Sequence, residues 1–149
     1  MQETAANRLS DFLGKFDPAM AKSIRECRAA MRKRFPTARE LVYDNYNFFV
    51  IGYGPTERPA DCKVSIAANS KGVNLNFLDG SKLPDPRKML RGSGGRNRFV
   101  RLEGAVSLSK PELQDLLAAA AAAAEVPFPK SGKGKLIIRS VSEKQRPRR

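Results

Sequence analysis

The fold is decided near the middle of the chain by the stretch Lys63-Val-Ser-Ile-Ala-Ala-Asn-Ser-Lys-Gly-Val-Asn-Leu-Asn-Phe-Leu78. Apolar and polar residues alternate before and after residues 69–72, as they do in strands with one buried face. The connection Asn-Ser-Lys-Gly consists of residues that favour turns. The stretch therefore predicts an antiparallel hairpin.

Working outward from this hairpin, the sequence predicts further strands on both sides. Short apolar or alternating segments lie at residues 40–43, 47–53, 98–103 and 135–139. Asp44-Asn45 favours a turn between the first two, and prolines and glycines are frequent in the long connection 79–96. We expect an antiparallel sheet of about five to six strands.

Helical patterns flank the strands. Residues 4–15 have apolar residues at helical spacing, and Asp17-Pro18 is a typical start for a second helix, which Pro36 ends. Ser109-Lys-Pro-Glu112 has the pattern of a capping box before the alanine-rich run that ends near Pro127. The expected fold class is α+β, with the N-terminal helices and one helix of the C-terminal half packed on one face of the sheet.

The positive charge is concentrated in two segments. The chain of 149 residues has 28 Lys and Arg, 15 Asp and Glu, and a net charge of +13. Residues 87–101 have a net charge of +6 and residues 130–149 one of +7, so these two segments account for the whole excess. We expect one domain over residues 1–141 and a disordered basic tail over residues 142–149.

Composition excludes several chemistries and favours a cytoplasmic location. The chain has no His, which excludes His-based acid–base catalysis and His-rich metal sites, and two Cys cannot fill a four-thiolate site. No apolar signal core is present in the first 30 residues, and the longest apolar run, residues 116–124, is far below the ~20 residues of a membrane span. We expect Cys27 and Cys62 to be buried thiols rather than a disulfide. No cofactor and no metal site are predicted.

The first candidate site combines the tyrosines with neighbouring polar residues. All three tyrosines of the chain lie between positions 43 and 53. The candidate ligand-binding residues are Tyr43, Asp44, Asn45, Tyr46, Tyr53 and Arg58, which together supply hydroxyl, carboxylate, amide and guanidinium groups. A turn stabilised by Asp and Asn side chains, with the rings packed at the sheet edge, explains the same pattern.

The second candidate site is the glycine-rich part of the basic segment 87–101. Its glycines allow backbone conformations that aim successive N–H groups at an anion. The candidate anion-binding residues are Arg91, Gly92, Ser93, Gly94, Arg96 and Arg98. It is no Walker loop, because no Gly-Lys-Ser/Thr follows, and a flexible connection between strands explains it equally well.

Several phrases of the sequence resemble one protein family. They are Leu41-Val-Tyr-Asp-Asn-Tyr-Asn47, Ile51-Gly-Tyr-Gly-Pro-Thr-Glu-Arg-Pro59, Leu83-Pro-Asp-Pro86 and Leu90-Arg-Gly-Ser-Gly94. In this order they resemble the YdhG-like domain family of bacteria, and residues 138–149 resemble the basic tail of one of its subgroups. The resemblance implies a small α+β fold without an agreed reaction. One branch of the family is regarded as frataxin-like in delivering iron, but the scattered acids and the net charge of +13 disfavour that role here.

These observations leave three functions open. The first is a non-catalytic cytoplasmic binding or accessory domain that engages a small ligand or a protein partner through the sheet and its loops. The second is weak, nonspecific binding of nucleic acid or another polyanion through residues 87–101 and the tail, which lacks interleaved aromatic residues. The third is an enzyme that uses Tyr, Lys, Asp or Cys. No membrane partner is expected, and the oligomeric state is left open.

Overall fold

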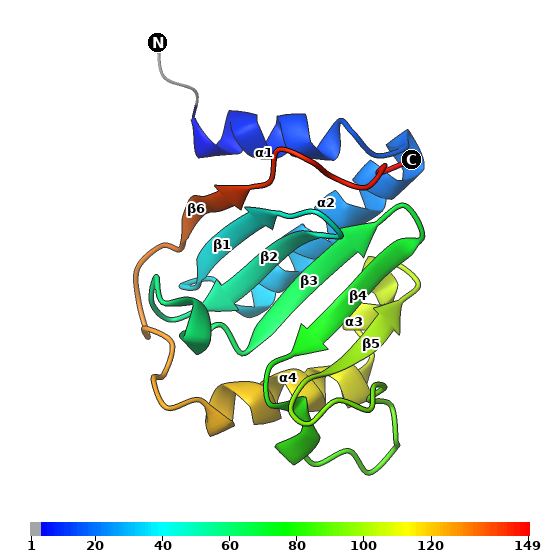
Figure 1. Cartoon of the computed structure of the whole chain (residues 1–149). Coiled ribbons are helices and arrows are strands. Elements are labelled where there is room, and N and C mark those ends of the chain that lie inside the picture. The colour runs from blue at the N-terminus through cyan, green and yellow to red at the C-terminus, as the bar shows by residue number, and fades with distance from the viewer. Residues whose placement is uncertain (1–3) are drawn as a thin grey trace.

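The computed structural model describes residues 4–149 as helices packed against one six-stranded sheet, an α+β fold (Figure 1). Residues 1–3, which belong to the predicted domain, lie outside this range. The strands are β1 (Arg39–Asp44), β2 (Phe49–Gly54), β3 (Val64–Asn69), β4 (Gly72–Phe77), β5 (Arg98–Leu102) and β6 (Lys135–Val141). Their order in the sheet is β5-β4-β3-β2-β1-β6.

Most of the sheet is antiparallel, as the sequence predicted. The predicted hairpin is formed by β3 and β4, with Ile66 opposite Leu75, and the pairs β1–β2, β2–β3 and β4–β5 are also antiparallel. Strand β6 differs, because it pairs parallel to β1 after a long connection from the last helix. The sheet is therefore mixed, and β6 forms one of its edges.

The helices are α1 (Ala5–Leu13), α2 (Pro18–Arg34), α3 (Ala105–Leu108) and α4 (Pro111–Ala123). In Figure 1, α2 and α3 lie behind the sheet, while α1 and α4 run along its two ends. Apolar residues of α1, α2 and α4 form one core with alternate residues of the strands, among them Val42, Ile51, Ile66 and Leu75. No helix within residues 4–149 is long and apolar enough to cross a membrane.

The predicted capping box is wrong. Helix α4 begins at Pro111, its N-cap is Lys110, and no side chain caps it. Ser109 instead follows the short helix α3 with helical backbone angles, and its hydroxyl donates to the backbone oxygen of Val106. A capping residue needs an extended backbone, so Ser109 cannot serve α4.

Within residues 4–149, no α-helix covers the opposite face of the sheet (Figure 1). Side chains alternate between the two faces of a strand, so the residues next to the core positions point to this side. The pairs Tyr43 with Val50 and Ser65 with Asn76 lie here. We call it the open face. The segment around η1 (Pro59–Asp61), a short 3₁₀ turn, approaches it, since Cys62 lies against Gly52 and Gly54.

Candidate functional site

The strand register separates the tyrosines that the sequence grouped together. Tyr43 pairs with Val50 on the open face, whereas Tyr53 pairs with Glu40 on the helix side. Tyr46 lies in the exposed turn after β1. The three tyrosines of the predicted cluster therefore lie in three separate environments.

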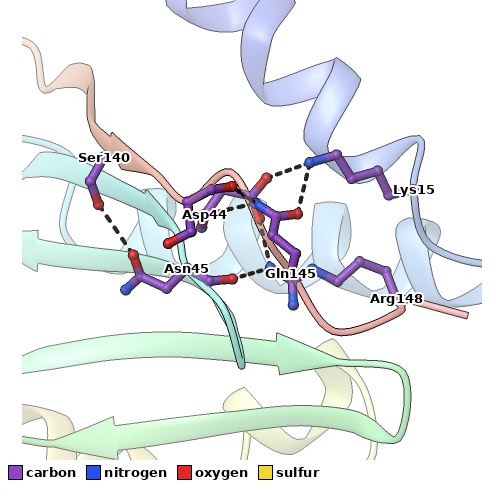
Figure 2. A network of polar contacts seen from close by, with 7 residues as sticks. Lys15, Asp44, Asn45, Ser140, Gln145 and Arg148 are labelled. Carbon is purple, nitrogen blue, oxygen red and sulfur yellow. Dashed lines mark hydrogen bonds and ion pairs between the residues drawn. The ribbon is translucent and has the colours of Figure 1, made fainter.

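Asp44 ends β1 on the helix side and is almost completely buried, with 1% of its side chain exposed. Lys15 Nζ lies 2.7 Å from Asp44 Oδ2, and Arg148 Nη2 lies 2.8 Å from Asp44 Oδ1 (Figure 2). Gln145 donates to the backbone oxygen of Asp44 and accepts from Lys15. Burial alone would raise the pKa of Asp44, but the hydrogen bonds from Lys15, Arg148 and Gln145 outweigh it and hold the pKa below its ordinary value. Asp44 is therefore charged in the folded protein and has a structural role in holding Lys15 and Arg148.

The basic tail, residues 142–149, packs against the rest of the domain in the structure. It crosses from β6 to the end of α1, close to the turn after β1 (Figures 1 and 2). Arg148 is only 4% exposed, and its Nη2 also donates to the backbone oxygen of Asn45. Arg146 donates to the side chain of Asn47 and stacks on Tyr46, and Arg149 donates to the backbone oxygens of Gly14 and Lys15, the two residues that follow α1. The physical reason is that buried Asp44 and exposed backbone oxygens give these cations partners inside the chain.

Tyr53 is fully buried against a second carboxylate. Its hydroxyl donates to Glu40 Oε2 over 2.9 Å, and Arg28 of α2 donates to both oxygens of Glu40. Burial, followed by the Glu40 charge, raises the pKa of Tyr53 well above its ordinary value. These contacts give Tyr53 a structural role in joining α2 to the sheet.

Tyr53→Phe and Tyr43→Phe remove the same hydroxyl from opposite faces and should have different effects on stability. Tyr53→Phe removes a hydrogen bond to a charged group, so we expect a loss of about 1.5–3 kcal/mol in the free energy of unfolding. Tyr43→Phe removes a hydroxyl that has no hydrogen-bond partner within residues 4–149, so we expect a change within about 0.5 kcal/mol. Urea unfolding followed by circular dichroism measures both. Equal losses of stability in the two variants would contradict the assignment of different roles to Tyr53 and Tyr43.

A cavity of about 400 Å³ lies on the open face and forms the candidate site. We call it the open-face cavity. Its lining comes from all five strands β1 to β5 and from the residues around η1, and its polar residues include Tyr43, Cys62, Ser65, Asn76 and Arg98. Arg98 pairs with the core residue Phe77, so its side chain leaves β5 on the helix side. Gly52 also lines it, and the missing side chain there makes room for Cys62.

Tyr43 lines this cavity, and its hydroxyl oxygen is buried without a hydrogen-bond partner among residues 4–149. Burial and the nearby Cys62 thiol raise the pKa of Tyr43, while the Arg139 guanidinium opposes the rise. Burial, with a contribution from Asp61, raises the pKa of Cys62 to about 11. Both groups are consequently protonated at neutral pH.

The structure places Arg58 outside the lining, although its neighbours Pro59 and Cys62 belong to it. Asp61 accepts a hydrogen bond of 2.6 Å from the Thr56 hydroxyl. Within residues 4–149 no ion pair joins Arg58 to Asp61. Thr56 therefore orients the Asp61 carboxylate in this loop.

The glycine-rich segment uses two of its arginines to hold its own shape. Arg96 Nε lies 2.6 Å from Asp79 Oδ1, and Lys63 also contacts this carboxylate. The hydrogen bond from Arg96 is the main reason that the pKa of Asp79 falls to about 2. The backbone of Arg91 pairs with that of Phe99 in an isolated bridge.

The other members of this candidate site are mostly exposed. Gly92 has a φ of 112°, a conformation that favours glycine, and Ser93 and Gly94 lie in the exposed part of the segment. Arg98 donates to the backbone oxygens of Gly94 and Asn97 and also lines the open-face cavity. The structure thus joins the two candidate sites at Arg98 and Tyr43, which line the same cavity.

Sequence reasoning missed several residues of the cavity, namely Cys62, Ser65, Asn76 and Phe99. The signal for two of them was present in the hairpin, where Ser65 and Asn76 occupy the polar positions of the alternation. Polar positions of a strand are ordinarily solvent-exposed, so the alternation alone did not mark them as a site. The described residues 4–149 bring no three His, Cys, Asp or Glu side chains together as a metal-binding group.

Comparisons of the chain with protein-family models, with curated proteins and with solved structures found no match. The resemblance to the YdhG-like family stays a prediction.

Proposed function

We propose that this protein is a non-catalytic binding domain whose small ligand occupies the open-face cavity. The observation that carries the proposal is a cavity of about 400 Å³ on the open face, where polar side chains of Tyr43, Cys62, Ser65 and Asn76 lie beside apolar residues such as Val50 and Phe99. The volume lies within the range of about 300–1,000 Å³ that is usual for ligand sites.

The chemistry of the lining supports binding rather than catalysis. The Cys62 thiol, with its pKa raised to about 11, and the Tyr43 phenol are both protonated at neutral pH. A protonated thiol is a poor nucleophile, because the thiolate is the reactive form. Steady turnover of a substrate that Tyr43→Phe abolishes would contradict this part of the proposal.

The proposal keeps the YdhG-like resemblance as its family assignment and the cytoplasm as its location. Two free thiols, Cys27 and Cys62, support a reducing compartment. A small ligand is favoured over a protein partner because the candidate residues Tyr43 and Arg98 both border a cavity.

The test is a screen of a small-molecule fragment library by chemical-shift mapping of backbone amides. We expect binders whose shifts cluster on β1 to β5 around the cavity. Ser65→Leu places a larger side chain in the cavity and should abolish these shifts. Asn74→Leu is the matched control, since Asn74 lies on the same face of the next strand but outside the lining.

Two results would count against the proposal. One is the absence of any compound whose shifts map to the cavity. The other is equal loss of binding in Ser65→Leu and Asn74→Leu, which would place the binding elsewhere on the open face.

A further inference from the structure

Strand β5, at the edge of the sheet opposite β6, presents an aromatic and a basic side chain on the open face (Figure 1). Phe99 is partly exposed, and it pairs with Asn76 and lines the open-face cavity together with it. Arg101 is exposed and lies two residues beyond Phe99, so its side chain leaves the strand on the same face. The two residues are therefore neighbours along one face, separated by roughly 7 Å of backbone.

Arg91 adds a second guanidinium group beside the same ring. Its backbone N–H donates to the oxygen of Phe99 over 2.8 Å, and its oxygen accepts from the Phe99 N–H over 3.0 Å. Two residues that exchange both hydrogen bonds lie directly opposite each other in an antiparallel pair, and their side chains share a face. Since Arg91 is also exposed, Phe99 has one arginine beside it on the neighbouring segment and another on its own strand.

The Arg101 side chain has a defined place over β4. At Gly72, the first residue of β4, the space that a Cβ atom would take is occupied by the Arg101 guanidinium. Lys71, the exposed residue that precedes Gly72 in the turn between β3 and β4, adds a further cation nearby in the chain. We call Lys71, Arg91, Phe99 and Arg101 the β5-edge patch.

The cations of the β5-edge patch have no acidic partners. Within residues 4–149, no ion pair includes any of the three, although Glu103 directly follows β5. Residues 87–101 contain no Asp or Glu, and Asp79, which contacts this segment, is already paired with Arg96. The patch therefore has three positive charges without an ion-pair partner, and such a surface attracts polyanions.

An aromatic ring among arginines favours one kind of polyanion. Proteins bind single-stranded nucleic acid by combining cations that contact the phosphates with aromatic rings on which unpaired bases stack. The bases of a duplex are already paired and stacked, and an acidic peptide has none, so neither partner would use the Phe99 ring in this way. The ring and the charges together thus match a single strand better than either alternative.

We propose that the β5-edge patch binds single-stranded nucleic acid, with one base stacked on Phe99 and the adjacent phosphates bound by Arg91 and Arg101. This inference goes beyond the proposed function, because the three cations of the patch do not line the open-face cavity. The binding tolerates different sequences, since every base has a face that can stack on the ring.

The test measures binding of fluorescein-labelled oligonucleotides of about twelve nucleotides by fluorescence anisotropy. Oligothymidylate is compared with an abasic strand of the same length, which keeps the phosphates and lacks the bases. We expect oligothymidylate to bind about 5- to 150-fold more tightly, the range that corresponds to one stacked base. Between about 50 and 200 mM salt, the logarithm of the affinity should fall with a slope of about −2 against the logarithm of the salt concentration, because each of three phosphate contacts contributes about −0.7.

Matched variants separate stacking from charge. Phe99→Ala should remove the difference between oligothymidylate and the abasic strand and leave the salt slope unchanged. Arg91→Gln and Arg101→Gln should each reduce the slope by about 0.7 and weaken both strands alike. Tyr46→Ala removes an exposed ring after β1, and Arg25→Gln removes an exposed charge on α2; both are controls that should bind like the wild type. Circular dichroism checks that each variant is folded.

Three results would overturn the inference. Equal affinity for oligothymidylate and the abasic strand would mean that the protein contacts phosphates alone. Equal losses in Arg91→Gln and Arg25→Gln would reduce the effect to overall charge. Binding of a duplex of the same length as tightly as the single strand would show that no unpaired base is used.

The failure of this inference can be told apart from failure of the proposed function. Ser65→Leu, which places a larger side chain in the open-face cavity, should leave oligonucleotide binding unchanged. A loss in Ser65→Leu as large as that in Phe99→Ala would place the base inside the cavity and overturn the separate site. The fragment screen tests the cavity without any nucleic acid, so its outcome does not depend on the β5-edge patch.

Discussion

Replacing Asp44 with alanine is expected to lower the free energy of unfolding by about 3–5 kcal/mol, the range for breaking a buried ion pair at one partner. The loss is large because the substitution leaves the buried Arg148 guanidinium without its carboxylate. Arg148 has only 2% of its side chain exposed, and its Nε and Nη1 atoms are buried without partners even when Asp44 is present. Without the carboxylate, a buried cation keeps one backbone oxygen and the ring of Phe16 as its surroundings. Urea unfolding followed by circular dichroism measures the loss.

Two variants separate the ion pair from a general effect of substitution. The double variant Asp44→Leu with Arg148→Met removes both charges, and we expect it to lose less stability than Asp44→Ala, since no charge is left unpaired. Asp11→Ala removes an exposed carboxylate of α1 and should change stability by no more than about 0.5 kcal/mol. Asp44→Ala within that same limit would mean that the tail does not hold Arg148 in a buried position.

The pH dependence of stability has a definite sign at the same residue. In the folded protein the pKa of Asp44 lies below its ordinary value of 3.8, so the unfolded chain binds the proton more readily. The stabilisation that Asp44 contributes is therefore fully present at pH values above its ordinary pKa. It is lost as the pH falls through the lower pKa that Asp44 has in the folded protein. The wild-type protein should lose more stability on acidification than the Asp44→Leu, Arg148→Met variant.

The strands could be predicted from the sequence because their signal is local. The alternation of Val64, Ile66, Leu75 and Phe77 lies within one hairpin, and each of these residues is buried on the helix side. Strand β6 was predicted as a strand, but not as the parallel partner of β1, because its pairing depends on the path of a long connection. Local patterns specify elements and leave such distant pairings open.

The candidate sites depended on distant pairings and were harder to predict. Asp44 and Arg148 are 104 positions apart, so the sequence showed a cluster of tail arginines without their buried partner. Similarly, the register of β1 against β2 places Tyr53 beside Glu40 and sends Tyr43 to the other face. The residue types near the site were predictable, whereas their division between a structural and a binding role was not.

The second large effect is expected in the core beneath α1. Phe49 of β2 is 1% exposed, and the rings of Phe12 and Phe16 both lie with their centroids 6.2 Å from its own. Phe49→Ala removes this ring from a packed site, so we expect a loss of about 3–5 kcal/mol in the free energy of unfolding. Phe99→Ala, the same change at a partly exposed position on the open face, should lose less than half as much. Similar losses at both positions would show that the core is not concentrated on the helix side.

Phe49 also connects the core to the tail. The ring of Phe16 packs against Phe49, and its centroid lies 6.0 Å from the Arg148 guanidinium carbon. Phe49 therefore supports a ring that belongs to the surroundings of the buried cation. Residues that share a partner in this way have non-additive effects of about 0.5–3 kcal/mol. We therefore expect the Phe49→Ala, Asp44→Ala double variant to lose less stability than the two single losses combined, because either change alone already loosens α1 and the tail. Additivity within about 0.5 kcal/mol would show that the tail is held independently of the aromatic cluster.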